Sequence, residues 1–523
     1  MSQSGSVEFS SWRAFLWPVH RHELKKLIPM LLIFFLISFD YNILRTLKDT
    51  LVVTAKSSGA EVIPFIKVWM MFPGAVLMTF IFTRLSNRLN REKVFYAMIS
   101  VFLIYFFAFV FLLYPNRDSL HPHELADYLE SVSPAGFKGM IAMFRYWTFT
   151  TFYVMSELWS NIILAMLFWG FANQITKIGE AKRFYGLFGI GVNFSGIAAG
   201  QLSVLCCTNS YNPNFWGADA WEQTLISLVS LVLLAGVAAL GIFRWMNKQV
   251  LTDPLYYNPT DENRGEVTGR MSMRENFSYL FKSRYLSCIA IVVIAYNLVI
   301  NLVEVLWKAQ VRELYPNPTD YTLYMNQVTT IIGVISTLAA LFISGNSIRK
   351  CGWTFTALLT PVILLLTSVG FFTFFFMKSY SVDLSAISLA GATPLALVVF
   401  FGTAQNCLCR AAKYSVFDAT REMAFVPLSS ECKIKGKAAI DGVCNRLGKS
   451  GGSVIHQTLL LIFASLSASA PYVAGILVAT ISLWIYAVSS LGKKFTSLTS
   501  AQPATVPLNN HPVGEVTLQE QQA

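Results

Sequence analysis

The sequence predicts an all-α polytopic membrane protein with twelve transmembrane helices. Of its 523 residues, 54% are hydrophobic and only 13% are charged, whereas soluble globular chains carry about 25% charged residues. The mean hydropathy is +0.52. Many stretches reach the roughly 20 apolar residues that a membrane-spanning helix needs. The predicted spans lie at residues 27–54, 61–83, 94–114, 139–173, 184–207, 222–244, 285–311, 326–345, 354–377, 387–416, 437–465 and 471–492.

The loops between these spans differ in charge. Lys and Arg gather before span 1 and after spans 2, 4, 6, 8 and 10, whereas loop 115–138 is mainly acidic and loop 208–221 has no basic residue. Cytoplasmic loops collect Lys and Arg, so we expect both termini in the cytoplasm. We therefore attribute the net charge of +11 to the basic loops that orient the protein in the membrane, and we expect no nucleic-acid partner. The eight cysteines show no metal-ligand spacing, so no metal site is predicted.

An internal repeat divides the chain. The segment YNILRTLKD in span 1 is partly repeated as YNLVINLVE in span 7, which aligns Asn42 with Asn297 and Asp49 with Glu304. Two parallel repeats of this kind are the plan of major-facilitator transporters, whose substrate site lies between the halves near the membrane midplane. We therefore predict a cytoplasmic N-terminal segment at 1–26, six-helix halves at 27–244 and 285–492, a cytoplasmic linker at 245–284 and a disordered cytoplasmic tail at 493–523.

Basic residues inside the predicted spans suggest an anionic ligand. A charge at a helix centre costs about 2.5–3.5 kcal/mol on insertion scales, so such residues face the bundle interior or water. Arg45 and Lys48 are three residues apart on one helix, and Arg446 and Lys449 repeat this spacing in the second half. Adjacent cations favour a polyanion shared between the halves. The candidate phosphate-binding residues are Arg45, Lys48, Lys413, Arg446 and Lys449.

The same charges have a structural interpretation, because intramembrane ions also pair with one another and hold helices together. Arg45 and Asp49 are four residues apart and could form such a pair. Asp40 and Lys308 receive lower weight, since they could lie near helix ends or extend toward the interface. Carboxylates repel phosphate, so Asp49, Glu157 and Glu304 are candidates for gating or proton coupling. Secondary candidates are Asn42, Asn301, Arg145 and Lys437.

Glycine-rich segments do not form a nucleotide-hydrolysing motif. LGKSGG at 447–452 lacks the spacing of a P-loop and lies in a predicted membrane helix. Gly448, Gly451 and Gly452 are better explained by close approach of a neighbouring helix or of the substrate. FGIGVNFSGIAAG at 188–200 is interpreted as a packing face of span 5. No catalytic triad is visible, so we expect no enzymatic activity.

Several long segments resemble the ATP/ADP translocases of intracellular bacteria and plastids. They include LRTLKDTLVVTA at 44–55, SELWSNIILAMLFWGF at 156–171, NLVEVLWKAQV at 301–311 and KAAIDGVCNRLGKSGG at 437–452. The resemblance covers about residues 10–495 and implies a twelve-helix transporter of the inner membrane. It also implies transport roles for one Lys and one Glu in each half. By motif these are Lys48, Glu157, Glu304 and Lys449, with Lys413 and Lys437 as alternatives to the last.

The expected function is exchange of ATP, or another nucleoside triphosphate, for ADP or another diphosphate without hydrolysis. The alternative is proton-coupled net uptake of GTP, UTP or ATP. Expected partners are the lipid bilayer and nucleotides, with CTP as a further candidate and phosphate or protons as co-substrates. We expect no cofactor, a monomer, and a bacterial inner-membrane location.

Overall fold

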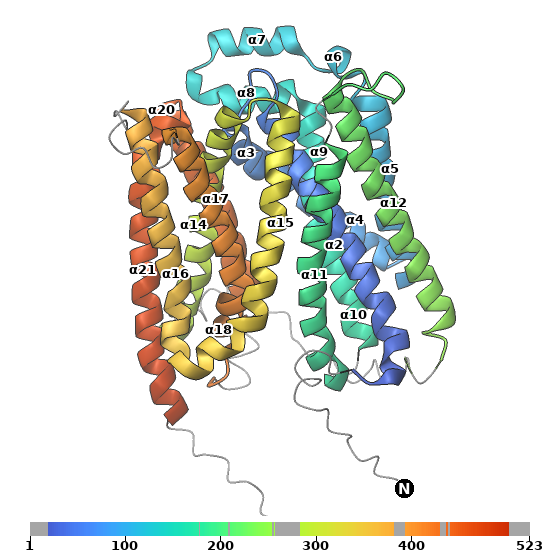
Figure 1. Ribbon diagram of the computed structural model, residues 1–523, viewed down its shortest axis with the longest axis vertical. Coiled ribbons are helices and arrows are strands. Elements are labelled where there is room, and N and C mark those ends of the chain that lie inside the picture. The colour runs from blue at the N-terminus through green and yellow to red at the C-terminus, as the bar shows by residue number, and fades with distance from the viewer. Residues whose placement is uncertain are drawn as a thin grey trace, which may run out of the picture.

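The computed structural model describes residues 19–176, 178–207, 210–253, 256, 283–380, 393–428, 436–437 and 440–500. Every regular element among these residues is a helix, and eleven helical segments are long and apolar enough to cross a membrane (Figure 1). The predicted all-α membrane class is confirmed.

The first half begins with one long helix and contains several local π-helical segments. Helix α12 starts where Asp219 accepts a hydrogen bond from the backbone N–H of Glu222 at 2.7 Å, which satisfies one free donor of its first turn. The segments of this half are α2 (Leu24–Val53), α3 (Val62–Phe65), η2 (Ile66–Met70), α4 (Met71–Ser86), α5 (Arg91–Ala108), η3 (Phe109–Leu113), α9 (Trp147–Leu158), η5 (Trp159–Phe168), α10 (Trp169–Ile175), α11 (Ile178–Cys206) and α12 (Ala220–Gln249).

The second half has side-chain caps at three helix starts, where Ser283, Asn317 and Thr393 each accept a bond from a backbone N–H. Helix α16 is interrupted at Gly352, which has a φ of +79°. Glycine adopts positive φ angles without the steric strain that a side chain would cause. The segments are α14 (Arg284–Leu314), α15 (Pro318–Phe342), α16 (Ser344–Ser379), α17 (Pro394–Ala412), η8 (Lys413–Phe417), α18 (Asp418–Ala424), η9 (Ile440–Cys444), α20 (Asn445–Phe463) and α21 (Leu466–Ser500).

The structure differs from the predicted boundaries at several points, including the start of α15 at Pro318 where residue 326 was predicted. The expected span 437–465 corresponds to η9 and α20, but the polar stretch NRLGKSGGSVIHQ keeps this region out of the eleven apolar segments. The expected span at 139–173 starts later, because Tyr146 leaves the helical conformation and separates α8 (Lys138–Arg145) from α9. Helix α21 continues to Ser500, so a disordered tail from residue 493 is wrong for its first residues. Residues 501–523 and most of the predicted linker lie outside the described residues.

The helices contact one another both within and between the two groups seen in Figure 1. Helix α2 contacts α9, α11 and α12, and α14 contacts α17, α20 and α21, whereas α11 and α2 contact α15 across the interface. A Cβ on Gly200 of α11 would lie 2.7 Å from the carbonyl oxygen of Asn326 on α15. The predicted packing role of the glycine-rich segment at 188–200 is thereby confirmed at Gly200.

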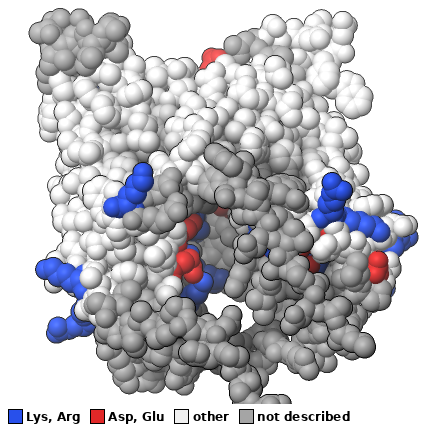
Figure 2. Space-filling view, turned by 60° about the horizontal axis from the view of Figure 1, so that its bottom comes forward, with Lys and Arg blue, Asp and Glu red and all other residues white. Residues whose placement is uncertain are grey.

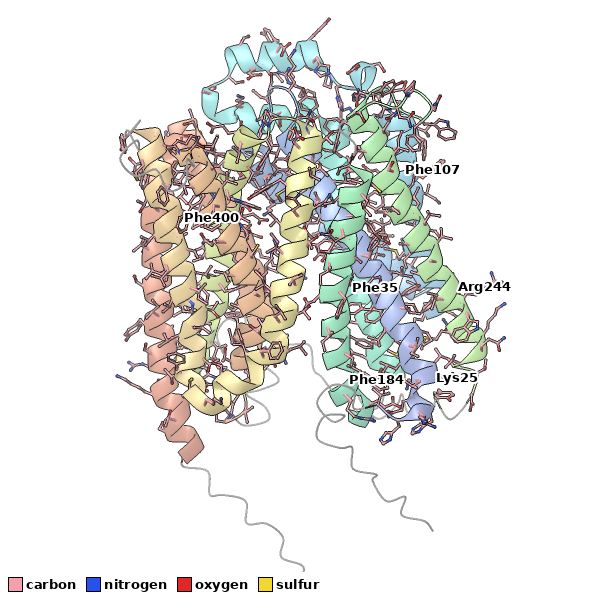
Figure 3. The ribbon with its side chains drawn as sticks, in the orientation of Figure 1. Lys25, Phe35, Phe107, Phe184, Arg244 and Phe400 are labelled. Carbon is pink, nitrogen blue, oxygen red and sulfur yellow. The ribbon has the colours of Figure 1, made fainter. Side chains whose placement is uncertain are left out.

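Large apolar side chains cover the outside of the bundle, as a protein in lipid requires. Phe107 and Phe400 are 51% and 62% exposed, and Figure 3 marks both, together with Lys25 and Arg244 toward the lower end. We call this the basic end of the bundle, because the basic loops of the described chain belong to it.

A small helical cap, formed by α6 (Arg117–Leu120), α7 (His123–Val132), η4 (Ala135–Phe137) and α8, lies over the opposite end (Figure 1). Arg145 holds α7 through ion pairs with Asp127 at 2.5 Å and Glu130 at 2.7 Å. Arg145 therefore stabilises the cap and lies apart from the predicted midplane site. Burial lowers the pKa of His121 in this cap to about 4, so His121 stays neutral at physiological pH.

Candidate functional site: a central charge network between the halves

One carboxylate, that of Asp49, joins the two halves. Its Oδ1 accepts from Nζ of Lys48 on α2 at 2.8 Å, and its Oδ2 accepts from Nζ of Lys308 on α14 at 2.8 Å. All three side chains are at most 3% exposed. Charges buried this deeply are retained only when they are paired, and here the pairing crosses from α2 to α14.

Each of the two lysines also contacts a glutamate of its own half. Lys48 lies 3.0 Å from Oε1 of Glu157 on α9, and Lys308 lies 3.0 Å from Oε1 of Glu304 on α14. Both halves therefore present the same lysine–glutamate pair on either side of Asp49. The ring of Tyr153 lies 3.9 Å from the Lys48 ammonium, a cation–π contact that adds to its stabilisation.

Three further basic side chains complete the site. Arg410 on α17 lies 3.8 Å from Glu304. Arg45 is half-buried on α2, within electrostatic range of Arg410 and Glu304. Lys67 of η2 donates to Oδ1 of Asn301 on α14 at 2.8 Å. The central charge network is thus Arg45, Lys48, Lys67, Lys308 and Arg410 with Asp49, Glu157 and Glu304, so five basic groups face three acidic ones.

The structure brings together most of the residues predicted in the first half. Arg45, Lys48, Asp49 and Glu157 all belong to the network. The alternative in which Arg45 pairs with Asp49 is not what the described residues show, since both oxygens of Asp49 are bonded to lysines.

The cations predicted in the second half have surroundings that differ from those of the network. Arg446 and Lys449 are exposed on α20, and Lys437 is exposed and pairs with Glu422 at 2.6 Å. Lys413 is half-buried at the start of η8. The phosphate-binding roles assigned to these four residues stay predictions, and α14 and α17 supply the second-half charges of the network instead.

The secondary candidates Asn42 and Asn301 differ in whether they contact the central charge network. Asn42 donates to the carbonyl oxygen of Ser38 at 2.9 Å and to Oγ of Ser195 on α11 at 3.4 Å. Asn301 donates to the carbonyl oxygen of Asn297 at 3.1 Å and accepts from Lys67. Asn301 thus contacts the network directly, whereas Asn42 links α2 to α11 beside it.

The prediction from the sequence missed two members of the network, Lys67 and Arg410, and gave too little weight to a third, Lys308. Lys67 is a basic residue in the predicted span 61–83, and that position alone was a usable signal. Lys308 received lower weight because it could have lain near a helix end or extended to the interface, but its side chain is 3% exposed and its ammonium lies between two carboxylates. Arg410 lies within a predicted span, but nothing near it in the sequence indicates that it contacts Glu304.

Asp40, which received lower weight because it could have lain near a helix end, is completely buried inside α2. Neither carboxyl oxygen has a hydrogen-bond partner in the described part of the protein. An ionised carboxylate without a partner is expensive in a membrane interior. Asp40 is therefore a candidate for reversible protonation.

The bundle is hollowed at one end and closed at the other. Figure 2 shows a hollow in the face toward the basic end, with acidic and basic side chains inside it. At the cap end, Arg312 of α14 donates to the carbonyl oxygens of Ala55, at 3.2 Å, and Ser58, both in the loop after α2. Nearby, the hydroxyl oxygens of Thr50 on α2 and Thr322 on α15 are 2.8 Å apart. These contacts hold the halves together on the cap side of Asp49.

Comparison with known families identifies the chain's relatives. The family model described as "TLC ATP/ADP transporter" matches residues 2–495. The chain belongs to this ATP/ADP transporter family. ADP,ATP carrier protein 1 of Chlamydia muridarum is 46% identical over 502 residues, covering 96% of this chain and 94% of the relative. The chloroplastic ADP,ATP carrier protein 2 of Arabidopsis thaliana is 42% identical over 479 residues, covering 92% of this chain and 76% of the relative.

Solved transporters share the fold of this ATP/ADP transporter family member. A bacterial homologue of the iron transporter ferroportin in an inward-facing state matches with a TM-score of 0.53 at 12% identity, covering 92% of this chain and 99% of that one. A D-xylose-proton symporter matches with a TM-score of 0.51 at 13% identity, covering 91% and 97%. Both similarities concern the fold, which supports the predicted major-facilitator-like class.

Proposed function

We propose that this protein exchanges ATP for ADP across a membrane by alternating access, without hydrolysing either nucleotide. The excess of basic over acidic groups in the central charge network carries this proposal, because a buried surplus of positive charge requires an anionic partner. The names of the relatives as ADP,ATP carrier proteins support adenine nucleotides as that partner. We further propose a bacterial inner membrane as the location, with both termini in the cytoplasm and the basic end facing it.

The ion pairs suggest how binding is coupled to movement. A polyphosphate that reaches the hollow brings several negative charges and competes with Asp49 for the ammonium groups of Lys48 and Lys308. Guanidinium groups bind phosphate through paired hydrogen bonds, which suits Arg45 and Arg410. When Lys308 changes partner, α2 is released from α14 and the two halves can rock about the site.

Exchange is tested with the purified protein in liposomes that contain ADP, by measuring uptake of labelled ATP. We expect uptake to require internal ADP. Lys48→Ala and Lys67→Ala should each reduce uptake by roughly 10- to 100-fold, the loss expected for a hydrogen bond to a charged group. Lys248→Ala, at an exposed position near the end of α12, is the matched control. Wild-type uptake by correctly inserted Lys48→Ala protein would contradict the proposal.

Proton-coupled net uptake of nucleoside triphosphates is the second candidate, and the unpaired burial of Asp40 favours it. A protonophore separates the two functions. It should stop net uptake into liposomes without internal nucleotide but leave exchange unchanged. Running both assays with labelled GTP, UTP and CTP defines the range of substrates.

A further inference from the structure

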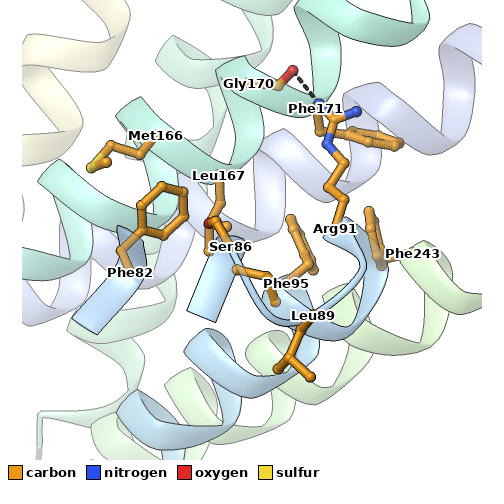
Figure 4. A pocket seen from close by; sticks show the side chains of 11 residues that line it. Phe82, Ser86, Leu89, Arg91, Phe95, Met166, Leu167, Gly170, Phe171 and Phe243 are labelled. Carbon is orange, nitrogen blue, oxygen red and sulfur yellow. Dashed lines mark hydrogen bonds between the residues drawn. The ribbon is translucent and has the colours of Figure 1, made fainter. Parts of the chain in front are cut away.

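A cavity of about 250 Å³ lies in the first half, apart from the central charge network. It is lined by residues of α4, the α4–α5 connection, α5, the η5–α10 segment and α12 (Figure 4). Its walls are mainly apolar: Phe82, Phe95, Leu167, Phe171 and Phe243. Phe95 and Phe243 stack with ring centroids 3.7 Å apart, so one wall is a fixed aromatic surface.

One cation, Arg91, lies at the edge of this apolar space. It is half-buried at the first position of α5. Its Nη2 donates to the carbonyl oxygen of Gly170 at 2.5 Å across the cavity (Figure 4), and its guanidinium lies 5.8 Å from the ring centroid of Phe171. These contacts hold the cation at one place on the rim.

The surroundings of Arg91 add positive charge at the level where membrane spans meet water. Three exposed basic residues lie around Arg91: Arg84 near the end of α4, Arg88 between α4 and α5, and Lys93 in the first turn of α5. The acidic residue there, Glu92, accepts a hydrogen bond from Tyr96 at 2.7 Å. Loops rich in Lys and Arg at this level attract anionic lipid headgroups.

The apolar lining and the cation at the edge of the cavity together indicate what kind of ligand it binds. A soluble anion would not use the aromatic walls, and a neutral lipid would not use Arg91. The volume is below the roughly 300–1,000 Å³ of typical small-molecule sites, which suits part of an acyl chain better than a whole soluble ligand. We propose that this cavity is a binding site for one anionic phospholipid, with its phosphate at Arg91 and the start of an acyl chain between Phe82, Phe95 and Phe171.

Native mass spectrometry of the full-length protein tests this proposal, with dioleoyl phosphatidylglycerol or dioleoyl phosphatidylcholine added in detergent. We expect one phosphatidylglycerol to be retained in preference to phosphatidylcholine. Arg91→Gln should weaken its binding at least fivefold, the effect of about 1 kcal/mol from one surface cation. Arg21→Gln, at an exposed position of the same end, is the charge control.

A second variant tests the cavity without changing any charge. A Cβ at Gly170 would meet nothing within 4 Å, so Gly170→Leu fills the space and leaves the carbonyl partner of Arg91 in place. We expect it to remove the retained lipid. Gly241→Leu on α12, where a Cβ also meets nothing within 4 Å, is the matched control and should retain it.

Three outcomes would overturn the proposal. The first is equal retention of phosphatidylcholine and phosphatidylglycerol. The second is unchanged phosphatidylglycerol binding in folded Gly170→Leu protein. The third is displacement of the lipid by glycerol phosphate at equal concentration, which would show that the headgroup alone is bound.

Discussion

A single side chain, Asp49, makes the two halves of this protein interdependent. Its two oxygens bind ammonium groups from α2 and α14, so a change at this position affects both helices together. Breaking a buried ion pair by removing one partner typically costs about 3–5 kcal/mol, because the remaining charge is left uncompensated. Here Lys48 and Lys308 each keep one glutamate when Asp49 is removed, which reduces that cost.

We therefore expect Asp49→Asn and Lys308→Gln to be strongly non-additive. Either change alone leaves an unbalanced charge, whereas the double variant removes both members of one pair. The coupling energy should lie between about 0.5 and 3 kcal/mol, measured from thermal unfolding of the four purified proteins in detergent. Additive effects within error would show that the contact between Asp49 and Lys308 contributes nothing of its own.

Helix α20 shows how glycine positions determine the distance between elements. A Cβ at Gly448 would lie 2.8 Å from the carbonyl oxygen of Ile294 on α14, and one at Gly452 would lie 2.7 Å from Cβ of Asn301. A Cβ at Gly451, on another face, meets nothing within 4 Å. The prediction that these glycines permit close helix approach is confirmed for Gly448 and Gly452, while Gly451 has no such contact.

These positions provide a matched pair of substitutions. We expect Gly448→Ala to lower the midpoint of thermal unfolding, because α20 must move away from α14 to admit the methyl group. Gly451→Ala should leave the midpoint unchanged or raise it, since alanine is favoured over glycine in a helix by about 1 kcal/mol. A lower midpoint for Gly451→Ala than for Gly448→Ala would contradict the packing described for α20.

At the scale of the whole molecule, the sequence predicted the helical class and the first-half charges that the structure brings together, whereas the internal repeat stays a prediction. The class and these charges follow from patterns within one helix: apolar length, and the spacing of Arg45, Lys48 and Asp49. In the second half, the position of Glu304 in a predicted span indicated its place in the network, but its basic partners were not predictable in this way. Lys308 and Arg410 reach the network because α14 and α17 place them opposite α2, and no spacing along the chain encodes that placement. Arg446 and Lys449 matched the expected spacing but lie on an exposed face of α20.

The closed cap end gives a prediction for the whole transport cycle. Thr50 and Thr322 belong to different halves, and their hydroxyl oxygens are 2.8 Å apart. The two side chains are therefore in direct contact, so cysteines at these positions are candidates for a disulfide bond between the halves. We expect Thr50→Cys with Thr322→Cys, oxidised in membranes, to stop nucleotide uptake, and dithiothreitol to restore it.

The single-cysteine variants are the controls and should transport before and after oxidation. Suppose that mass spectrometry verifies the crosslink and the oxidised double variant still transports as fast as the same protein after treatment with dithiothreitol. Then α2 and α15 do not separate at this point during the cycle.

The position of Asp49 has a consequence for how a cell keeps its nucleotide pool. In the exchange that we propose, Asp49 occupies both lysines while the site is empty, so we expect the unloaded protein to be held in one orientation. A nucleotide would then be needed on either side of the membrane before the halves reorient. On this proposal each molecule taken up is matched by one released, and the total number of nucleotides inside the cell stays constant.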